Sequence, residues 1–352
     1  MDFPSDPFFK KTNIAMSKDN KFSNHYPSVA IIILNWNTWR DTIECLESLQ
    51  KVKYPNFRML VVDNGSTNDS VIKIMAWWNE IIIQDAKIGG IADKITIIRN
   101  AQNFGYCEGN NIGIDHVLNS EFPPDFVFFL NNDARLDQNC LYQCVMTAIK
   151  NNAGMVGAVP KSADGSKCLL GDAKFPRALF YPRKSFFPSD LPDSWVRDAV
   201  PGSGMLVRSD VLIKMKSIYN FYLNPDLFMY WDEMDFCVRA KKLGYKILMS
   251  GNAIIFHGMK SQLHGIERIP PYYYIARNGF LLGKELLSFY IKIIFYLYYP
   301  NYCLIRIIKK LIQSEKCAAF AILEGLKDGF RGIKGKWKYH DKYYKNFDVR
   351  PR

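Results

Sequence analysis

Four short apolar runs, each followed by asparagine or aspartate, constrain the fold of this chain more than any other feature. They are Val29–Leu34, Phe57–Val62, Ile95–Ile98 and Phe126–Leu130, and stretches with helical periodicity separate them. Continuous runs of this kind are typical of strands buried on both faces of a parallel sheet. The alternation therefore predicts an open α/β sheet over roughly residues 29–160.

Polar side chains follow each of these runs. They are Asn35 and Asn37, Asp63 and Asn64, Asn100 and Asn103, and Asn131 to Asp133. In open α/β sheets, ligands bind beyond the carboxyl ends of the strands. Four successive polar ends therefore favour a shared ligand site over ordinary turns. Neither G-x-G-x-x-G nor G-x-x-x-x-G-K-[ST] occurs, so the sequence does not support an ordinary dinucleotide or P-loop site.

The charge of the chain is concentrated at its C-terminus. The net charge is +12, and the stretch from Pro300 to Arg352 holds 13 Lys and Arg against 5 Asp and Glu. This distribution argues against a nucleic-acid-binding surface and for a nearly neutral body with a basic appendage. Eight cysteines without a C-x-x-C pair indicate a reducing compartment. Residues 1–27 are polar and are expected to be flexible. They lack the apolar run of a secretory signal, and together with the cysteines this leads us to expect a cytoplasmic protein.

The chain resembles family 2 glycosyltransferases in seven ordered segments: AIIILNWN, MLVVDNGSTNDS, NFGYCEGNNIG, FFLNNDARLD, PGSGMLV, YWDEMDFCVRAKKLGY and FHG. Within the family it is most similar to the rhamnosyltransferase-like branch that builds bacterial surface polysaccharides. The resemblance runs from Val29 to Asn278 and implies a GT-A fold, in which a nucleotide-binding α/β half is fused to an acceptor-binding half. We expect this domain over 28–270, followed by a helical, basic region over 271–352.

The resemblance also implies which residues bind the nucleotide sugar. The positions that match are Asn35, Asp63, Asn64, Phe104, Gly105, Asn110, Asn111 and Asn132. A carboxylate such as that of Asp63 can accept a hydrogen bond from the N3–H of uracil or thymine and from ribose hydroxyls. Gly105 would allow the backbone to approach a ligand closely.

A metal site is implied at the end of the fourth run. The family motif is Asp-any-Asp, whereas this chain reads Asn131-Asn132-Asp133, so one carboxylate remains. A hard divalent ion needs only one or two protein carboxylates beside diphosphate and water oxygens. His257 matches a position where some relatives add an imidazole, a ligand that suits Mn²⁺ better than Mg²⁺. We therefore expect Mg²⁺ or Mn²⁺ at Asp133 and His257, although a hydrogen-bonded histidine at a strand end is an alternative for His257.

The catalytic base is expected at the start of the helix that contains Asp232 and Glu233. Most relatives read Glu-Asp there, and this chain has the two acids exchanged. Position favours Glu233 as the base, whereas side-chain length leaves Asp232 as an alternative. The spacing of Asp235 and Arg239 indicates a structural ion pair.

The implied reaction is an inverting transfer of a sugar such as rhamnose from a UDP- or dTDP-linked donor. The acceptor is expected to be a hydroxyl of a glycan or lipid-linked molecule in surface polysaccharide synthesis. Two alternatives remain open: a catalytically silent nucleotide-sugar-binding protein, because the first metal acid is missing, and a sugar nucleotidyltransferase. The second lacks support, because no glycine-rich loop follows Val29–Leu34.

Residues 272–312 form the most apolar and aromatic part of the chain. Only 13 uncharged residues separate Lys292 from Arg306, and Pro300 lies among them. A membrane-spanning helix needs about 20, so the sequence predicts two amphipathic helices broken near Pro300. They either pack on the body or on a second copy in a homodimer, or lie at an anionic membrane surface. The expected contact would involve residues 284–352 on the inner face of the cytoplasmic membrane.

Overall fold

The fold was analysed in a computed structural model of the chain, which describes residues 26–85, 94–170, 174–176, 179, 191–257 and 269–343. The expected flexible segment 1–27 therefore lies outside the described residues except for its last two. The division of the chain into domains at 28–270 and 271–352 stays a prediction.

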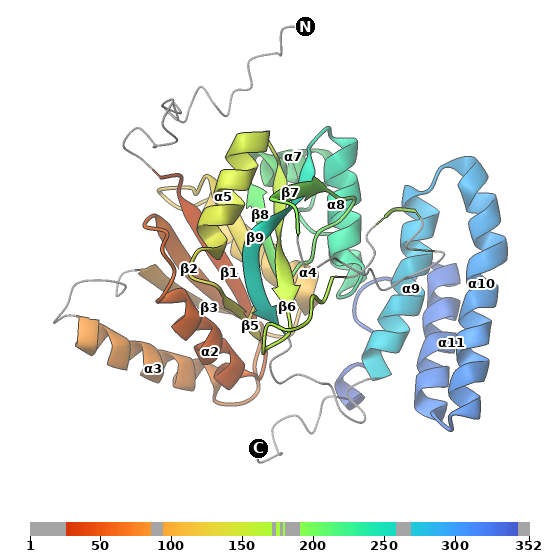
Figure 1. Cartoon of the computed structure of the whole chain (residues 1–352). Coiled ribbons are helices and arrows are strands. Elements are labelled where there is room, and N and C mark those ends of the chain that lie inside the picture. Colours follow the sequence, from red (N-terminus) through yellow and green to blue (C-terminus); the bar gives the residue numbers. More distant parts are fainter. Residues whose placement is uncertain are drawn as a thin grey trace, which may run out of the picture.

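One sheet of nine strands organises the structure (Figure 1). The strands are β1 (Val29–Asn35), β2 (Phe57–Asp63), β3 (Ile95–Arg99), β4 (Phe126–Asn131), β5 (Ala134–Leu136), β6 (Met155–Lys161), β7 (Ser194–Val196), β8 (Gly204–Arg208) and β9 (Ile247–His257). Their order is β3-β2-β1-β4-β8-β6-β9-β5, and β7 pairs with β9. Strands β1 to β4 are parallel, whereas β8 is antiparallel to both β4 and β6. The four apolar runs thus form a parallel half that continues into a mixed half.

Helices cover both faces of this sheet. They are α2 (Trp39–Leu49), α3 (Ser70–Asp85), α4 (Gly105–Leu118), α5 (Cys140–Asn151), α7 (Ser209–Tyr219) and α8 (Asp232–Lys242), with a short 3-10 turn, η2 (Pro225–Leu227). Helices α2, α3 and α5 pack on one face and α4, α7 and α8 on the other. Strand side chains alternate between the faces of a sheet. Ile31 and Ile33 therefore join the core beneath α2, α3 and α5, and Ala30 and Ile32 join the core beneath α4, α7 and α8.

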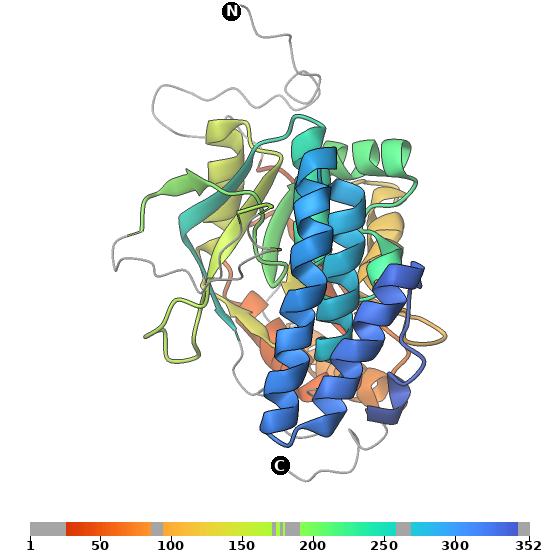
Figure 2. The same cartoon turned by 90° about the vertical axis from the view of Figure 1, so that its right-hand side faces the viewer.

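The C-terminal part of the described chain is a bundle of three helices beside the sheet (Figure 2). These are α9 (Ile269–Leu286), α10 (Phe289–Ile312) and α11 (Lys316–Arg331), followed by the short turn η4 (Asp341–Tyr343). Phe295 and Tyr299 of α10 are buried. An added Cβ would lie 2.3 Å from the Phe295 ring at Gly283 and 2.0 Å from the Tyr299 hydroxyl oxygen at Gly279. Glycine at these positions therefore lets α9 and α10 approach closely.

The structure confirms the α/β fold class with a C-terminal helical extension and corrects one detail. Helix α10 is continuous through Pro300 rather than broken there. Its packing on α9 and α11 compensates for the one backbone hydrogen bond that a proline removes. The residues after Gly244 lead into one long strand, β9, which ends at His257. Among the described helices none is long and apolar enough to cross a bilayer.

Candidate active site

The carboxyl ends of β1 and β2 meet through a buried cluster of hydrogen bonds. Asn35 and Asp63 are register partners and both are fully buried. The Asn35 amide donates to Asp63 Oδ1 at 2.7 Å, and the Ser66 hydroxyl donates to the same oxygen at 2.5 Å. The Asp63 carboxylate therefore holds the turn after β2. Its predicted contact with a base stays a prediction.

Asn64 connects the end of β2 to the start of α4. Its Oδ1 accepts from the backbone N–H of Phe104 at 3.2 Å, and its Nδ2 donates to the carbonyl of Gly105 at 3.0 Å. Gly105 has a φ of +84°, and an added Cβ would lie 2.6 Å from the carbonyl oxygen of Phe228. The close approach expected at Gly105 is thus made here to the chain just before the predicted base.

The structure places three of the predicted nucleotide-binding asparagines in structural contacts. The side chain of Asn110 donates to the backbone of its own helix, and Asn111 exchanges two 2.9 Å hydrogen bonds with the backbone of Leu223. Asn132 donates to the Thr42 hydroxyl at 2.9 Å. None of these three lines the pocket described below, and their binding roles remain untested predictions.

The two predicted metal ligands lie together. Ala134 of β5 is the register partner of His257 at the end of β9, so Asp133 is next to the histidine. Its Oδ1 lies 3.2 Å from Nε2 of His257, and the amide nitrogen of Asn131 lies 3.2 Å from the same ring nitrogen. Both side chains of the pair are partly exposed. The fold therefore brings together residues that are 124 positions apart in the sequence.

This donor set fits a divalent cation that is shared with a ligand. No group of three or more His, Cys, Asp or Glu with metal-binding geometry occurs among the described residues. The protein accordingly offers one carboxylate and one imidazole. A hard cation that also takes diphosphate and water oxygens needs no more, and the mixed oxygen and nitrogen donors suit Mn²⁺.

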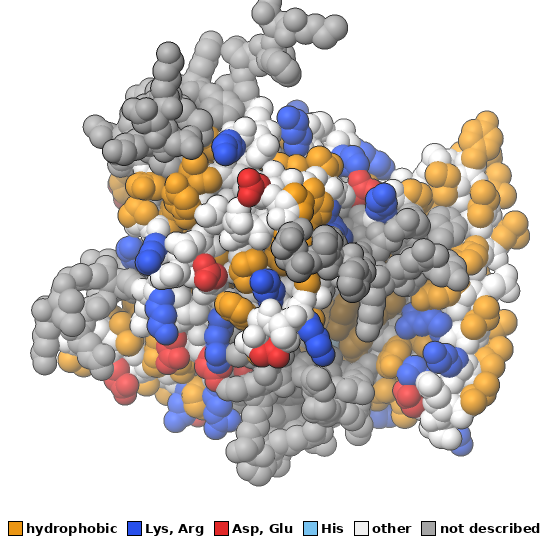
Figure 3. All heavy atoms as spheres, viewed as in Figure 1, with side chains coloured by type: hydrophobic (Ala, Val, Ile, Leu, Met, Phe, Trp, Pro, Cys, Tyr) orange, Lys and Arg blue, Asp and Glu red, His pale blue; other side chains and the backbone are white. Residues whose placement is uncertain are grey.

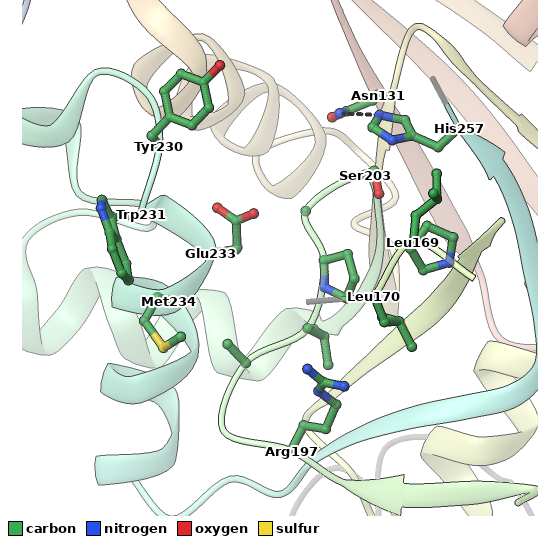
Figure 4. A pocket seen from close by; sticks show the side chains of 15 residues that line it. Asn131, Leu169, Leu170, Arg197, Ser203, Tyr230, Trp231, Glu233, Met234 and His257 are labelled. Carbon is green, nitrogen blue, oxygen red and sulfur yellow. Dashed lines mark hydrogen bonds between the residues drawn. The ribbon is translucent and has the colours of Figure 1, made fainter. Parts of the chain in front are cut away.

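A cavity of about 410 Å³ opens at this edge (Figure 4). Its volume is within the range of small-molecule sites. Sequence reasoning missed most of its wall, although it had singled out PGSGMLV as a motif. The polar and aromatic lining residues are Asn131, Arg197, Ser203, Tyr230, Trp231, Glu233 and His257. The side chain of Glu233 points into the open space, with Asn131 and His257 on the opposite wall (Figure 4).

The two candidate bases differ in their exposure. Glu233 lines the cavity, whereas Asp232 is buried and does not. Burial raises the pKa of Asp232 well above its usual range, and the negative charge of Glu233 raises it further. Burial also raises the pKa of Glu233, against the lowering effect of hydrogen bonds from Asp232 and the Gly202 backbone. The hydrogen bond between the two side chains raises the pKa of Asp232 and lowers that of Glu233, so Asp232 has the more strongly raised pKa of the pair.

The chain before these acids has an unusual backbone. Phe228, Tyr230 and Trp231 have φ values of +64°, +66° and +66°. Each non-glycine residue in the left-handed region costs about 1–3 kcal/mol and persists only where the surroundings impose it. Trp231 directly precedes α8, so this strained segment sets the position of the two acids.

Two buried residues of α9 hold that segment in place. The amide of Asn278 donates to the carbonyls of Leu227, Met229 and Tyr230 at 2.9, 2.8 and 2.9 Å. Arg277 donates to the carbonyl of Leu227 at 2.8 Å and through Nε to Oδ1 of Asn278 at 2.8 Å. Both are fully buried. Sequence reasoning did not single them out; a charged and an amide residue inside an apolar helical stretch was the available signal.

The family model described as Glycosyl transferase family 2 matches residues 30–215. The low-salt glycan biosynthesis hexosyltransferase Agl10 of Haloferax volcanii is 23% identical over 309 residues, which cover 85% of this chain and 91% of that protein.

Two solved structures show the same fold. The mannosyltransferase PcManGT from Pyrobaculum calidifontis, in complex with GDP-Man and Mn²⁺, gives a TM-score of 0.56 at 13% identity and 93% coverage of both chains. Residues 1–349 of S. aureus TarS, in complex with UDP-GlcNAc, give a TM-score of 0.53 at 13% identity, covering 92% of this chain and 88% of that one. Since the family model matches more than half of the sequence, the chain belongs to glycosyl transferase family 2 and is a glycosyltransferase.

Proposed function

We propose that this glycosyltransferase moves a sugar from a nucleoside-diphosphate donor to an acceptor hydroxyl, with inversion at the anomeric carbon. The position of Glu233 carries the proposal: its carboxylate points into a cavity whose opposite wall is the strand-end edge of Asn131 and His257. A donor with its diphosphate at that edge and an acceptor beside Glu233 would face each other across the cavity.

Glu233 would act as the general base. Its carboxylate accepts the proton of the acceptor hydroxyl as the oxygen bonds to the anomeric carbon and the bond to the nucleoside diphosphate breaks. Asp232, protonated, donates a hydrogen bond to Glu233 and so orients it. One in-line displacement completes the transfer, so no residue is assigned as a covalent nucleophile.

Asp133 and His257 would hold a Mg²⁺ or Mn²⁺ ion together with the donor diphosphate. When bound, the ion supplies positive charge that stabilises the departing diphosphate. The chain's own contribution is to orient the two ligands from the β4–β5 turn and the end of β9. The relative solved with GDP-Man and Mn²⁺ supports a divalent ion in this fold.

The donor is proposed to be a hexose or rhamnose nucleotide, with UDP, dTDP or GDP as the leaving group. UDP and dTDP follow from the sequence resemblance, and GDP is added because one structural relative was solved with GDP-Man. The acceptor is proposed to be a glycan or lipid-linked molecule in surface glycan synthesis, consistent with the glycan-biosynthesis hexosyltransferase among the relatives.

A panel of nucleotide sugars tests this function. UDP-, dTDP- and GDP-sugars are incubated with the full chain and Mn²⁺, Mg²⁺ or EDTA, and binding by calorimetry and release of the nucleoside diphosphate are measured. We expect one nucleotide class to bind, with metal-dependent release that Glu233→Gln abolishes. Binding without release, or release that persists in Glu233→Gln, would contradict a catalytic role for this site.

We further propose that the C-terminal region, within 284–352, contacts an anionic membrane. The outward side of α10 carries an exposed apolar stripe (Figure 3), which is interrupted at the exposed Asn301. Its members are all at least 49% exposed: Phe289, Tyr290, Ile293, Ile294, Leu297, Leu304, Ile305, Ile308, Leu311 and Ile312. The helix contains four Lys and Arg and no acidic residue. This combination is typical of a helix that lies in the plane of a membrane surface.

The charges of the following segment are already engaged. Lys334 pairs with Asp226 at 2.6 Å, Lys336 with Asp341 at 2.7 Å, and Lys338 lies 3.5 Å from Glu324. The membrane contact is therefore assigned to the α10 face rather than to these lysines.

Vesicle binding tests the contact. We expect salt-sensitive binding of the full chain to vesicles with anionic lipid, little binding to neutral ones, and loss of binding in Ile294→Glu/Leu297→Glu. The matched control Ile72→Glu/Ile83→Glu on α3, where both residues are exposed, should bind normally. If wild type ignores anionic vesicles and instead dimerises through α10, a second copy covers the face.

A further inference from the structure

A second cavity adjoins the candidate active site. It has a volume of about 370 Å³ and is lined by Tyr230, Trp231, Ile275, Tyr299, Tyr302 and Arg306, among others. Tyr230 and Trp231 also line the catalytic cavity. The two cavities are therefore adjacent and meet at these two side chains.

The chemistry of the second cavity is unlike that of the first. Its described lining contains no Asp, Glu or His, and its only charged group is the guanidinium of Arg306. That group lies 5.6 Å from the ring centroid of Tyr302 and 5.9 Å from that of Tyr272. Among the described residues no carboxylate lies within salt-bridge distance of Arg306. An arginine with this setting binds phosphate oxygens well, because its planar fork matches them.

Glu233 makes the two cavities complementary. Its carboxylate disfavours a second anion beside it, away from the Asp133–His257 edge, so the anionic part of an acceptor is better placed beyond Trp231. The aromatic rings where the two cavities meet can pack against the apolar face of a sugar. On the far side, Arg306 belongs to α10, whose opposite face carries the exposed apolar stripe.

We propose that this cavity, the Arg306 cavity, binds the phosphate of a lipid phosphate to which the acceptor sugar is attached. The inference rests on the proposed function and narrows its acceptor class from any glycan to a phospholipid-linked one. The acceptor hydroxyl lies at Glu233, its ring lies against Tyr230 and Trp231, and its phosphate binds Arg306. The lipid then continues along α10 toward the membrane, where headgroup phosphates reside.

Binding of a short prenyl phosphate tests the assignment. Geranyl phosphate, and geraniol as its uncharged counterpart, are titrated into the full chain by calorimetry. We expect geranyl phosphate to bind more tightly than geraniol. Arg306→Gln should weaken geranyl phosphate roughly 10- to 100-fold, the loss expected for a hydrogen bond to a charged group. Arg306→Lys should restore part of the affinity, and geraniol should not distinguish the variants.

Two controls separate this site from others. Lys309→Gln removes the same charge from an exposed position of the same helix and should leave the affinity for geranyl phosphate unchanged. Asp133→Ala impairs the proposed donor site and should also leave it unchanged. If Arg306→Gln binds like wild type, or if Asp133→Ala and not Arg306→Gln loses binding, the Arg306 cavity is not a phosphate site. Nucleoside diphosphate binding, measured on the same samples, tests the proposed function independently.

Discussion

Removing the Asn278 side chain tests whether α9 positions the catalytic acids. Asn278→Ala deletes a fully buried amide that donates to three carbonyls of the strained segment before α8. The two N–H groups contribute about 0.5–1.5 kcal/mol each, and buried carbonyls left without a donor add about 1–3 kcal/mol. A loss of roughly 2–6 kcal/mol in the free energy of unfolding follows.

The activity should fall for a related reason. Phe228, Tyr230 and Trp231 together hold about 3–9 kcal/mol of backbone strain. Without the amide, the segment relaxes toward ordinary φ values and displaces Glu233. If the amide holds the segment by about 2–3 kcal/mol, kcat should drop by about 30- to 150-fold. The donor KM should change little, because the Asn278 amide donates to the segment before α8 and not to the Asp133–His257 edge.

A matched control separates positioning from plain destabilisation. Leu141→Ala empties a fully buried site in the core on the other face of the sheet and costs about 2–5 kcal/mol. Both variants are assayed below their unfolding transitions, with kcat and KM measured separately. We expect Leu141→Ala to retain wild-type kcat. An Asn278→Ala enzyme that is equally destabilised but retains kcat within twofold would refute the positioning role.

Four further outcomes follow from the site. Glu233→Gln should lower kcat at least 100-fold. Asp232→Asn keeps a hydrogen-bond donor toward Glu233 and should retain far more activity. The reverse result in steady-state kinetics would make Asp232 the base and Glu233 its partner. Asp133→Ala should abolish the gain in nucleoside diphosphate affinity that Mn²⁺ confers, and unchanged metal dependence in calorimetry would contradict the ligand assignment. The pKa of Asp232 is raised in the folded state, so its ionisation opposes folding once the pH rises above its pKa in the unfolded chain, near 4. Asp232→Asn should therefore raise Tm at pH 7, by about 2 °C per kcal/mol of stabilisation. The difference in Tm between the variant and the wild type should vanish below pH 4. Burial raises the pKa of Glu233, whose polar neighbours are Asp232, Tyr106, Tyr230 and the Gly202 N–H. On acidification, kcat should therefore decline at a higher pH than an ordinary glutamate would give. A pH–rate profile that is flat down to pH 4.5 would exclude Glu233 as the base.

The sequence by itself was sufficient for the fold class and the family. Strands buried on both faces of a parallel sheet need continuous apolar runs. The sequence therefore predicts β1, β2 and β4 directly, and the polar residue after each run marks the end of the strand. Local chemistry of this kind depends on neighbours in the chain and does not require the tertiary structure. The same reasoning failed at Pro300, where packing of α10 on α9 and α11 outweighs the local preference of proline.

The tertiary structure alone decided which residues share a site. The contact of Asp133 with His257 arises because β5 pairs with β9, and strand pairing across a long loop is not encoded in either segment by itself. The sequence favoured Glu233 as the base by position but left Asp232 as an alternative, since both occupy the first turn of one helix. Their different exposure follows from the left-handed segment before α8, which Arg277 and Asn278 hold from α9 through backbone carbonyls. Hydrogen bonds to backbone carbonyls do not depend on the side chains of the segment that accepts them, and for this reason such a contact leaves no pairwise signal in the sequence.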